Sequence, residues 1–254
     1  MTENWQPIER ENLWGYLKRL RFVRRAVTVA FPDRRPNSLR VLDVGCGNGS
    51  QLSLSLVDDG FDLTGVDTDQ HSIEHARRLA ATRSNARFLC LRVEELDIAE
   101  TYDVVILSEV LEHVIDPFSL LKAGLSRLRA DGVMIVTVPN GYGEFEIDWW
   151  LFRMFRLQRI VDAIKSKDTK VVSSTDNQDD GHIQFFTLRR LRELFKECDL
   201  TISLESASSL FSGPILGHLL GRYDSFIEWN ARAADNLPPV FSSGWFFALR
   251  RVEG

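Results

Sequence analysis

The sequence predicts an α/β fold, built on a doubly wound, mostly parallel sheet of seven strands. A helical cap precedes the sheet and an insert follows its fifth strand. Short apolar segments alternate with amphipathic ones between residues 40 and 141, which is typical of βαβ units joined by right-handed crossovers. The 254 residues are 44% hydrophobic and 26% charged, a composition that suits one large globular domain with a decoration.

The first five strands follow one another at short intervals along the chain. Residues 102–108 are nearly all apolar, which predicts a strand buried on both faces. Pro117 follows Asp116, and proline is favoured at the first position of a helix. We expect strands at residues 40–45, 61–67, 87–91, 102–108 and 132–138, with helices at about 50–57, at about 70–81 and after Pro117.

The two ends of the chain depart from this alternation. Residues 8–31 have apolar side chains three or four positions apart with basic residues between them, which predicts an amphipathic helix. Residues 145–165 are aromatic and basic, and residues 166–181 form a polar loop. We then expect a helix at 187–198 capped by Thr187, a sixth strand at 200–204, an irregular region at 205–240 and a final strand at 245–250.

Composition and charge exclude several classes of protein. Three scattered cysteines without a CxxC pair argue against a disulfide framework or a thiolate zinc site, and they favour a reducing, cytoplasmic location. No apolar run approaches the ~20 residues of a membrane span. Residues 1–40 carry a formal charge of +5, so the remaining residues carry −10. Because residues 41–254 are strongly acidic, the sequence argues against a nucleic-acid partner.

The turn after the first strand carries the strongest motif, VLDVGCGNGS at residues 41–50. Glycines allow a sharp turn and a close approach of the backbone to a ligand, and the N–H groups at the next helix start favour an anionic group. A dinucleotide fingerprint needs a third glycine at position 50, where this chain has Ser50. The spacing here is G-x-G-x-G, with Asp43 two residues before the first glycine.

Three further segments follow the ends of expected strands. Asp67 closes the second strand, about 20 residues after the glycine turn, where a carboxylate accepts ribose hydroxyls in nucleoside-binding folds. Its alternative role is to cap the next helix, but Asp69 fits that role better and would leave Asp67 free. RVEEL at 92–96 follows the third strand and SEVLEHVIDP at 108–117 follows the fourth. Ligands of open α/β sheets bind at these carboxyl ends.

These motifs resemble class I S-adenosylmethionine-dependent methyltransferases, whose fold is Rossmann-like. Residues 109–117 closely resemble a segment of the group that includes ubiquinone-biosynthesis O-methyltransferases, and the resemblance covers residues 39–141 and 182–200. It implies that the glycine turn holds the aminocarboxypropyl end of S-adenosylmethionine and that residues 92–96 face adenine, although Arg92 replaces the usual acid. The implied cofactor-binding residues are Asp43, Gly45, Cys46, Gly47, Gly49, Asp67, Thr68, Val93, Glu94 and Ser108.

Glu109, Glu112 and His113 are the candidate catalytic residues, and three interpretations stay open. His113 is a general base that takes a proton from an acceptor hydroxyl, a role that contributes about 10²–10⁴-fold. Alternatively, Glu109, Glu112 and His113 join His182 in binding Mg, Mn, Fe or Zn, because small-RNA 2′-O-methyltransferases use an E-x-x-E-H arrangement in this way. In the third interpretation, Glu112 and His113 only hold the loop.

The resemblance divides the chain into four parts and predicts an enzyme. Residues 1–38 form the helical cap, 39–141 the cofactor-binding core, 142–181 an insert or lid, and 182–254 the rest of the sheet with substrate-pocket segments. The expected reaction transfers a methyl group to an oxygen of a small-molecule, sugar or lipid-linked acceptor. A metal-dependent RNA 2′-O-methyltransferase and a non-catalytic nucleoside-binding module are the alternatives.

Two basic amphipathic segments raise the prospect of a peripheral membrane contact. Residues 145–160 and the N-terminal helix suit either an interfacial helix near anionic lipid or ordinary core packing. If the basic helix meets an anionic acceptor or membrane, neutralising Arg24 and Arg25 should change acceptor affinity more than cofactor affinity.

Overall fold

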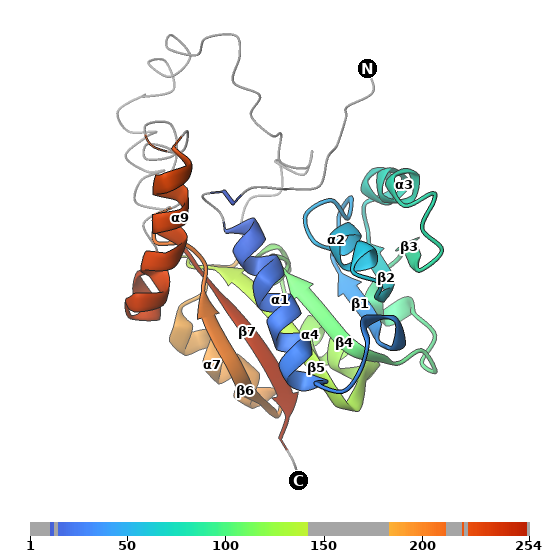
Figure 1. The fold of residues 1–254 in the computed structure, drawn as a ribbon. Helices are drawn as coiled ribbons and strands as arrows, with labels where there is room; N and C mark the ends of the chain where they lie inside the picture. Colours follow the sequence, from blue (N-terminus) through green and yellow to red (C-terminus); the bar gives the residue numbers. More distant parts are fainter. Residues whose placement is uncertain (1–10, 13–14, 142–182, 212–219, 221–222, 253–254) are drawn as a thin grey trace.

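A seven-stranded sheet forms the centre of the molecule in the computed structural model, with strand order β3-β2-β1-β4-β5-β7-β6 (Figure 1). The structure describes residues 11–12, 15–141, 183–211, 220 and 223–252. The strands are β1 (Arg40–Val44), β2 (Asp62–Asp67), β3 (Ala86–Cys90), β4 (Tyr102–Ser108), β5 (Leu128–Pro139), β6 (Leu200–Ala207) and β7 (Gly244–Arg251).

The strand pairing confirms the predicted mostly parallel sheet. β1 pairs in parallel with β2 and β4, and the parallel arrangement continues to β3 and β5. β7 is antiparallel to both of its neighbours, β5 and β6. Because the chain leaves β1 in one direction and resumes at β4 in the other, a crevice opens between the carboxyl ends of β1 and β4.

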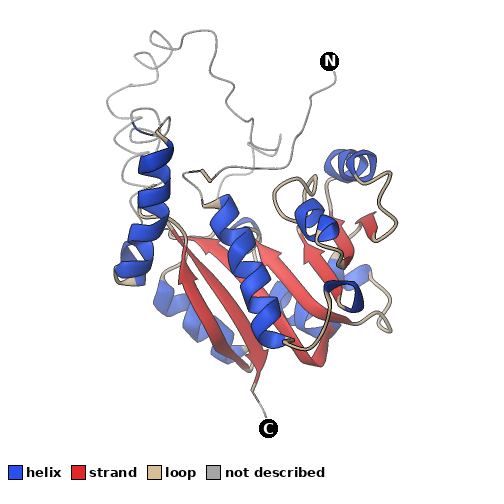
Figure 2. Cartoon of the chain, in the orientation of Figure 1, coloured by secondary structure: helices blue, strands red, loops and turns tan. Residues whose placement is uncertain are grey.

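Helices cover both faces of the sheet (Figure 2). Along β4, Val104 and Ile106 are buried with the helices of one face, and Val105 and Leu107 with those of the other, as the two-residue period of a strand requires. One face carries α1 (Tyr16–Ala30), α2 (Ser53–Asp58) and α3 (Gln70–Leu79), and the other α4 (Pro117–Arg127) and α7 (Leu188–Glu197). The short helices are η1 (Pro36–Ser38), η2 (Val93–Glu95), η3 (Leu111–His113), η4 (Ala234–Asn236) and η5 (Pro239–Phe241).

The N-terminal helix α1 packs as part of the core. Its apolar residues Leu20, Val23 and Val27 are buried, and the ring of Phe22 lies 5.6 Å from that of Phe246 on β7. Because the sheet covers this apolar face, α1 does not offer it to a membrane, which corrects the interfacial interpretation of this helix. The other predicted interfacial segment, 145–160, lies outside the described residues, as do the loop at 166–181 and the insert at 142–181.

The expectation of irregular structure at 205–240 is wrong in part. β6 continues to Ala207, and α9 (Asp224–Ala233) follows with η4 and η5. α9 buries Ile227 and Ala231, and its Asn230 side chain both accepts from the N–H and donates to the carbonyl of Phe211. These contacts form with distant parts of the chain, so local sequence did not reveal them. Within the described ranges no helix is long and apolar enough to cross a bilayer.

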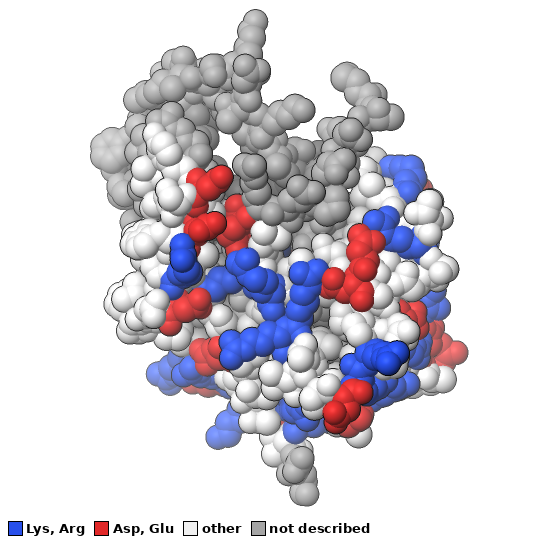
Figure 3. Space-filling model, viewed as in Figure 1, with Lys and Arg blue, Asp and Glu red and all other residues white. Residues whose placement is uncertain are grey.

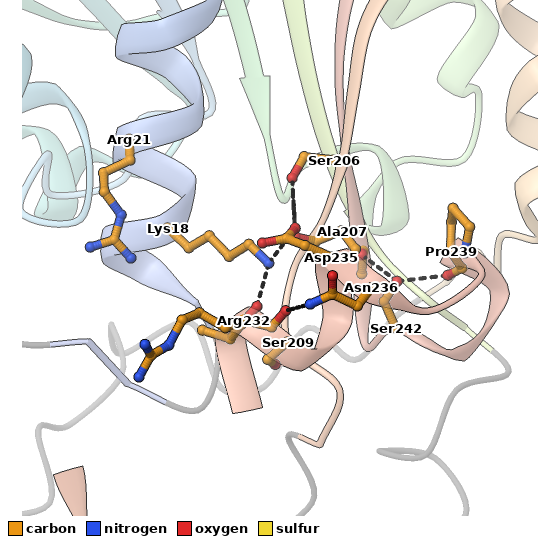
Figure 4. A network of polar contacts seen from close by, with 12 residues as sticks. Lys18, Arg21, Ser206, Ala207, Ser209, Arg232, Asp235, Asn236, Pro239 and Ser242 are labelled. Atoms are coloured by element: carbon orange, nitrogen blue, oxygen red, sulfur yellow. Dashed lines mark hydrogen bonds and ion pairs between the residues drawn. The ribbon is translucent and has the colours of Figure 1, made fainter. Parts of the chain in front are cut away.

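Lys18 connects the start of α1 to the end of α9 (Figure 4). Its Nζ donates to the carbonyl of Ala231 over 2.6 Å and lies 2.8 Å from Oδ1 of Asp235. Ser206 on β6 also donates to Asp235, over 3.4 Å. Burial lowers the pKa of Lys18, and the hydrogen bond and charge of Asp235 oppose that change. The network therefore holds the first turn of α1 against two elements that lie about 200 residues further along the chain.

Candidate active site

A cavity of about 1020 Å³ lies at the carboxyl ends of the central strands. All the described residues predicted for the cofactor or for catalysis line it, with the exception of Gly49. Gly49 has a φ of 74°, and a Cβ there would come within 3.2 Å of the Phe88 ring. We therefore assign Gly49 to packing of the turn against β3 instead of to contact with the cofactor.

The glycine turn is shaped for close approach of a ligand. Gly45 and Gly47 have φ values of 72° and 52°, a region that favours glycine. A Cβ on Gly45 would meet Val110 Cγ2 at 2.7 Å, so the backbone there passes tightly under the β4 loop. A Cβ on Gly47 would meet nothing within 4 Å, so this part of the turn borders the open cavity. The room beside Gly47 fits a cofactor held by backbone contacts.

Asp67 is held by two backbone hydrogen bonds. Its Oδ2 accepts from the Gly47 N–H over 2.8 Å, and its Oδ1 accepts from the Asp69 N–H over 2.9 Å. Asp69 caps α3 by accepting from the N–H groups of His71 and Ser72, as expected. Asp67 is therefore not free, but two ionised oxygens have about four acceptor positions, so two of them remain for ribose hydroxyls.

Asp43 is a buried carboxylate at the base of the glycine turn. Burial raises its pKa to about 6, while a hydrogen bond from Ser53 and the charge of Arg19 oppose the shift. Burial also raises the pKa of the Cys46 thiol well above its usual value, which argues against a reactive cysteine. A buried carboxylate beside a ligand-binding turn is suited to a cationic group of that ligand, because the pair would offset the cost of desolvation.

Glu109 adopts an unusual backbone conformation at the end of β4. Its φ of 53° is rare for a residue with a side chain and is characteristic of functional sites. The Glu109 N–H donates to the carbonyl of Thr137 over 3.0 Å, and the Thr137 hydroxyl donates to Glu109 Oε1 over 2.7 Å. The Ser108 hydroxyl lies 3.0 Å from the same threonine oxygen. β5 therefore fixes both predicted residues at the edge of the cavity.

Glu112 and His113 follow in η3. Glu112 is buried, and its Oε2 has no hydrogen-bond partner among the described residues. Burial and the neighbouring charge of Glu109 raise the pKa of Glu112 well above its usual value. Its main-chain carbonyl accepts from Ile183 and Gln184, over 2.9 and 3.0 Å. The more exposed His113 places Nε2 3.8 Å from Glu112 Oε1. The segment therefore both anchors a loop and presents an imidazole to the cavity.

The predicted metal ligands are brought together only in part. Glu109, Glu112 and His113 all line the cavity, but His182 lies outside the described residues. Over the described part of the chain, no group of three or more His, Cys, Asp or Glu side chains is arranged to hold a metal ion. The unpartnered Oε2 of Glu112 is a suitable oxygen donor, so the metal site stays a prediction.

Tyr16 and Arg19 on α1 also line the cavity, and the sequence did not single them out. Arg19 is buried, with its guanidinium 4.7 Å from the Tyr16 ring centre and 3.7 Å from Glu109 Oε1. Arg19 Nη2 donates to Gln51 over 3.2 Å. The only signal in the sequence was their place on the apolar side of the helix start, where a charged residue is unusual.

Apart from the buried Lys18, the other basic residues of α1, which are Arg21, Arg24 and Arg25, face solvent. Lys and Arg side chains gather over α1 in the middle of the face shown in Figure 3, with acidic side chains beside them. Arg24 donates twice to Asp59, over 2.6 and 2.8 Å, and does not line the cavity. Arg25 is exposed. The charge that reaches the site is therefore that of Arg19, and the expectation that placed Arg24 and Arg25 near the acceptor is not supported.

The remaining wall of the cavity comes from the second half of the chain. Asn140 follows β5, and its side chain donates to the carbonyls of Val240 and Ser242 over 3.1 and 2.9 Å. This wall thus joins the end of β5 to the start of β7. Its lining residues are Asn140, Ile183, Ser208, Ser243, Gly244 and Phe246.

The sheet order, the glycine turn after β1, the carboxylate after β2 and the cavity between β1 and β4 together define a Rossmann-like methyltransferase. Residues 14–205 match a family model described as a methyltransferase domain. The chain belongs to this methyltransferase family, and it is a class I S-adenosylmethionine-dependent methyltransferase.

Similar proteins agree with this assignment. A ubiquinone biosynthesis O-methyltransferase from Bradyrhizobium diazoefficiens is 40% identical over 104 residues, which cover 40% of each chain. One from Rickettsia akari is 32% identical over 145 residues, 55% of this chain and 57% of the relative. The chain therefore matches less than two thirds of either relative. The crystal structure of magnesium protoporphyrin IX methyltransferase from Synechocystis with bound S-adenosylhomocysteine (SAH) has the same fold. Its TM-score is 0.57 at 15% identity, over 93% of this chain and 83% of that one.

Proposed function

We propose that the protein transfers the methyl group of S-adenosylmethionine to an oxygen of a small-molecule, sugar or lipid-linked acceptor. The observation that carries the proposal is a single cavity that borders both the glycine turn with Asp67 and the Glu109–His113 segment. The first group suits a nucleoside cofactor and the second suits deprotonation of an acceptor. The names of the similar ubiquinone biosynthesis enzymes support oxygen as the methylated atom.

The residues of the cofactor side fit the chemical groups of S-adenosylmethionine. The backbone at Gly47 would border the methionine part, and Asp67 would accept the ribose hydroxyls. The Asp43 carboxylate would pair with the ammonium group of the methionine part, and the Arg19 guanidinium would pair with its carboxylate. The cofactor supplies an electrophilic methyl group on a sulfonium, so correct positioning accounts for much of the rate enhancement.

Deprotonation of the acceptor is assigned to His113. Its imidazole would accept the hydroxyl proton, because the pKa of histidine suits a base near neutral pH. Glu112 Oε1 lies 3.8 Å from His113 Nε2, so a protonated His113 would favour the ionised form of Glu112. Glu109, fixed by Thr137, would orient the acceptor beside the base.

The test is methylation of a panel of phenolic, glycosidic and RNA acceptors by the full chain with labelled S-adenosylmethionine, with and without EDTA. We expect the label on an oxygen of a phenolic or glycosidic compound. Activity that survives EDTA, with no metal by elemental analysis, supports His113 as base. Loss of activity that a divalent ion restores supports the metal interpretation. Label on nitrogen, carbon or RNA, or no thermal stabilisation of the chain by S-adenosylmethionine, would overturn the proposal.

A lipid-linked acceptor would also bring the protein to a membrane surface. Co-sedimentation with anionic liposomes at low salt tests this part of the proposal. Binding that falls as salt rises is the expected result, since exposed charges are screened. Absence of binding at low salt would limit the acceptors to soluble compounds.

A further inference from the structure

Arg127, the last residue of α4, reaches across to the segment that follows β3. Its guanidinium donates to four main-chain carbonyls: Val93 over 3.4 Å, Glu94 over 3.2 Å, Leu96 over 2.9 Å and Asp97 over 3.4 Å. These carbonyls belong to η2 and the turn after it. One side chain therefore holds nearly the whole of this short segment.

Arg127 is buried, and burial of its charged guanidinium costs free energy of desolvation unless hydrogen bonds replace the lost water. The residue is 4% exposed, and it forms no ion pair with any part of the chain that the structure describes. A buried guanidinium without a carboxylate partner must regain its lost hydration through hydrogen bonds. Here every donor contact goes to backbone oxygen, so the charge of Arg127 is used to fix a backbone conformation.

The segment that Arg127 holds is part of the cavity wall. Val93 and Glu94 line the cavity, and Val93 is buried. η2 has three hydrogen bonds of its own among the described residues. The Glu95 side chain accepts from the Arg92 N–H over 2.7 Å, the Glu95 N–H donates to the Arg92 carbonyl over 2.9 Å, and the Leu96 N–H reaches the Val93 carbonyl over 3.4 Å. Hydrogen bonding to the Val93 carbonyl also polarises the peptide that carries the Glu94 N–H and makes that group a better donor.

We propose that Arg127 is a positioning residue that sets the part of the site that binds the adenine ring. It acts through η2 and does not touch the cofactor, and the inference rests on the placement of adenine against η2 in the proposed function. Its removal weakens binding of the adenosine part of the cofactor and relaxes the preference for adenine. The chemical step is unaffected once the cofactor is bound.

The experiment compares Arg127→Met and Arg127→Lys with Arg251→Met. Arg251 is a matched control, because it donates to the carbonyls of Leu125 and Leu128 at the same end of α4 and not to η2. Calorimetry measures the dissociation constants of S-adenosylhomocysteine and of its inosine analogue, which replaces the adenine amino group. Steady-state assays give KM and kcat, and circular dichroism and thermal melts show whether each variant is folded.

For Arg127→Met we expect S-adenosylhomocysteine to bind at least about tenfold more weakly, and the adenosyl-to-inosyl preference to shrink. The KM for S-adenosylmethionine should rise while kcat at saturation stays near the wild-type value. The affinity of Arg127→Lys for S-adenosylhomocysteine should lie between those of wild type and Arg127→Met. Arg251→Met should bind it like wild type.

A folded Arg127→Met with wild-type affinity overturns the proposal. Weaker binding with an unchanged ratio of the affinities for S-adenosylhomocysteine and its inosine analogue also overturns it. An equal loss of affinity in Arg251→Met does the same, because both results would indicate general destabilisation. If Arg127→Met does not fold, the same criteria apply to Arg127→Lys. Binding needs no acceptor, so failure to methylate any acceptor would overturn the proposed function and leave this result intact.

Discussion

The cavity has two halves that are built in different ways. The proposed cofactor half is assembled from the ends of β1, β2, β3 and β4, whose site residues lie between Asp43 and Ser108. The proposed acceptor half combines Tyr16 of α1 with the ends of β5, β6 and β7, so its residues range from Tyr16 to Phe246, whereas Arg19 of α1 is assigned to the cofactor. Backbone turns shape the first half, and side chains from distant segments shape the second. We therefore expect cofactor binding to depend on local turns and acceptor choice to depend on how the whole chain folds.

The largest expected effect separates chemistry from cofactor binding. His113→Ala should lower kcat by about 10²–10⁴-fold if His113 is the base. The affinity for S-adenosylhomocysteine should not change, because the imidazole lies beyond the glycine turn and Asp67. Rapid-quench and calorimetric measurements check the two quantities. His71→Ala, at an exposed position on α3, is the control, and wild-type kcat in His113→Ala would favour a structural role for His113.

The second effect concerns the cofactor half alone. Asp67→Ala should weaken cofactor binding on the order of 100-fold, because hydrogen bonds to a charged group contribute about 1.5–3 kcal/mol each. The Gly47 N–H would lose its acceptor as well. Calorimetry with S-adenosylhomocysteine measures the change, and Asp62→Ala, at the exposed start of the same strand, provides the control. Unchanged affinity in Asp67→Ala would contradict the ribose assignment.

A third prediction uses the raised pKa of Asp43. The folded-state pKa of about 6 exceeds the ordinary value of 3.8, so the folded state holds this proton more tightly than the unfolded state. Stability from this group is therefore full below about pH 4 and is lost as pH rises through 6. Without cofactor, Asp43→Asn should remove this loss and stabilise the protein at pH 7.5 by up to roughly 3 kcal/mol.

Urea unfolding of wild type and Asp43→Asn between pH 4 and 8 measures the difference. Asn can still accept from Ser53, so the variant keeps the local hydrogen bond. The same variant should bind cofactor more weakly, because it lacks a charge to oppose the ammonium group. Parallel stability curves for the two proteins would show that Asp43 does not titrate in this range.

The smallest effect is expected on the outer face of α1. Arg24→Gln and Arg25→Gln should leave the KM of both substrates unchanged and alter stability by less than about 1 kcal/mol, as is usual for exposed ion pairs. Arg19→Gln, one turn earlier and facing the cavity, is the contrasting variant. A change in acceptor KM for Arg24→Gln would restore the link between the basic surface and the acceptor.

The sequence predicted the strands and the residues that line the proposed cofactor half, because both depend on neighbouring residues. Boundaries moved where side chains bind the backbone: Asn48 accepts from the Ser50 N–H and hydroxyl, so α2 begins at Ser53 instead of near Ser50. Arg19 and Arg127 belong to no motif, since their roles depend on elements that meet only in the folded chain. α9 was missed for the same reason, because its buried Asn230 pairs with a segment 19 residues away.

The position of β7 has a consequence for protein synthesis. β7 comes last among the seven strands in the chain, yet it lies between β5 and β6 in the sheet. Until β7 leaves the ribosome, β6 lacks its neighbour in the sheet, and α1 lacks part of the surface on which it packs. Strands β1 to β4 pair only with one another and with β5, so they do not have this requirement, and chains begin to fold from the N-terminal side during translation. The cofactor half can thus form on a nascent chain several seconds before the acceptor half is complete.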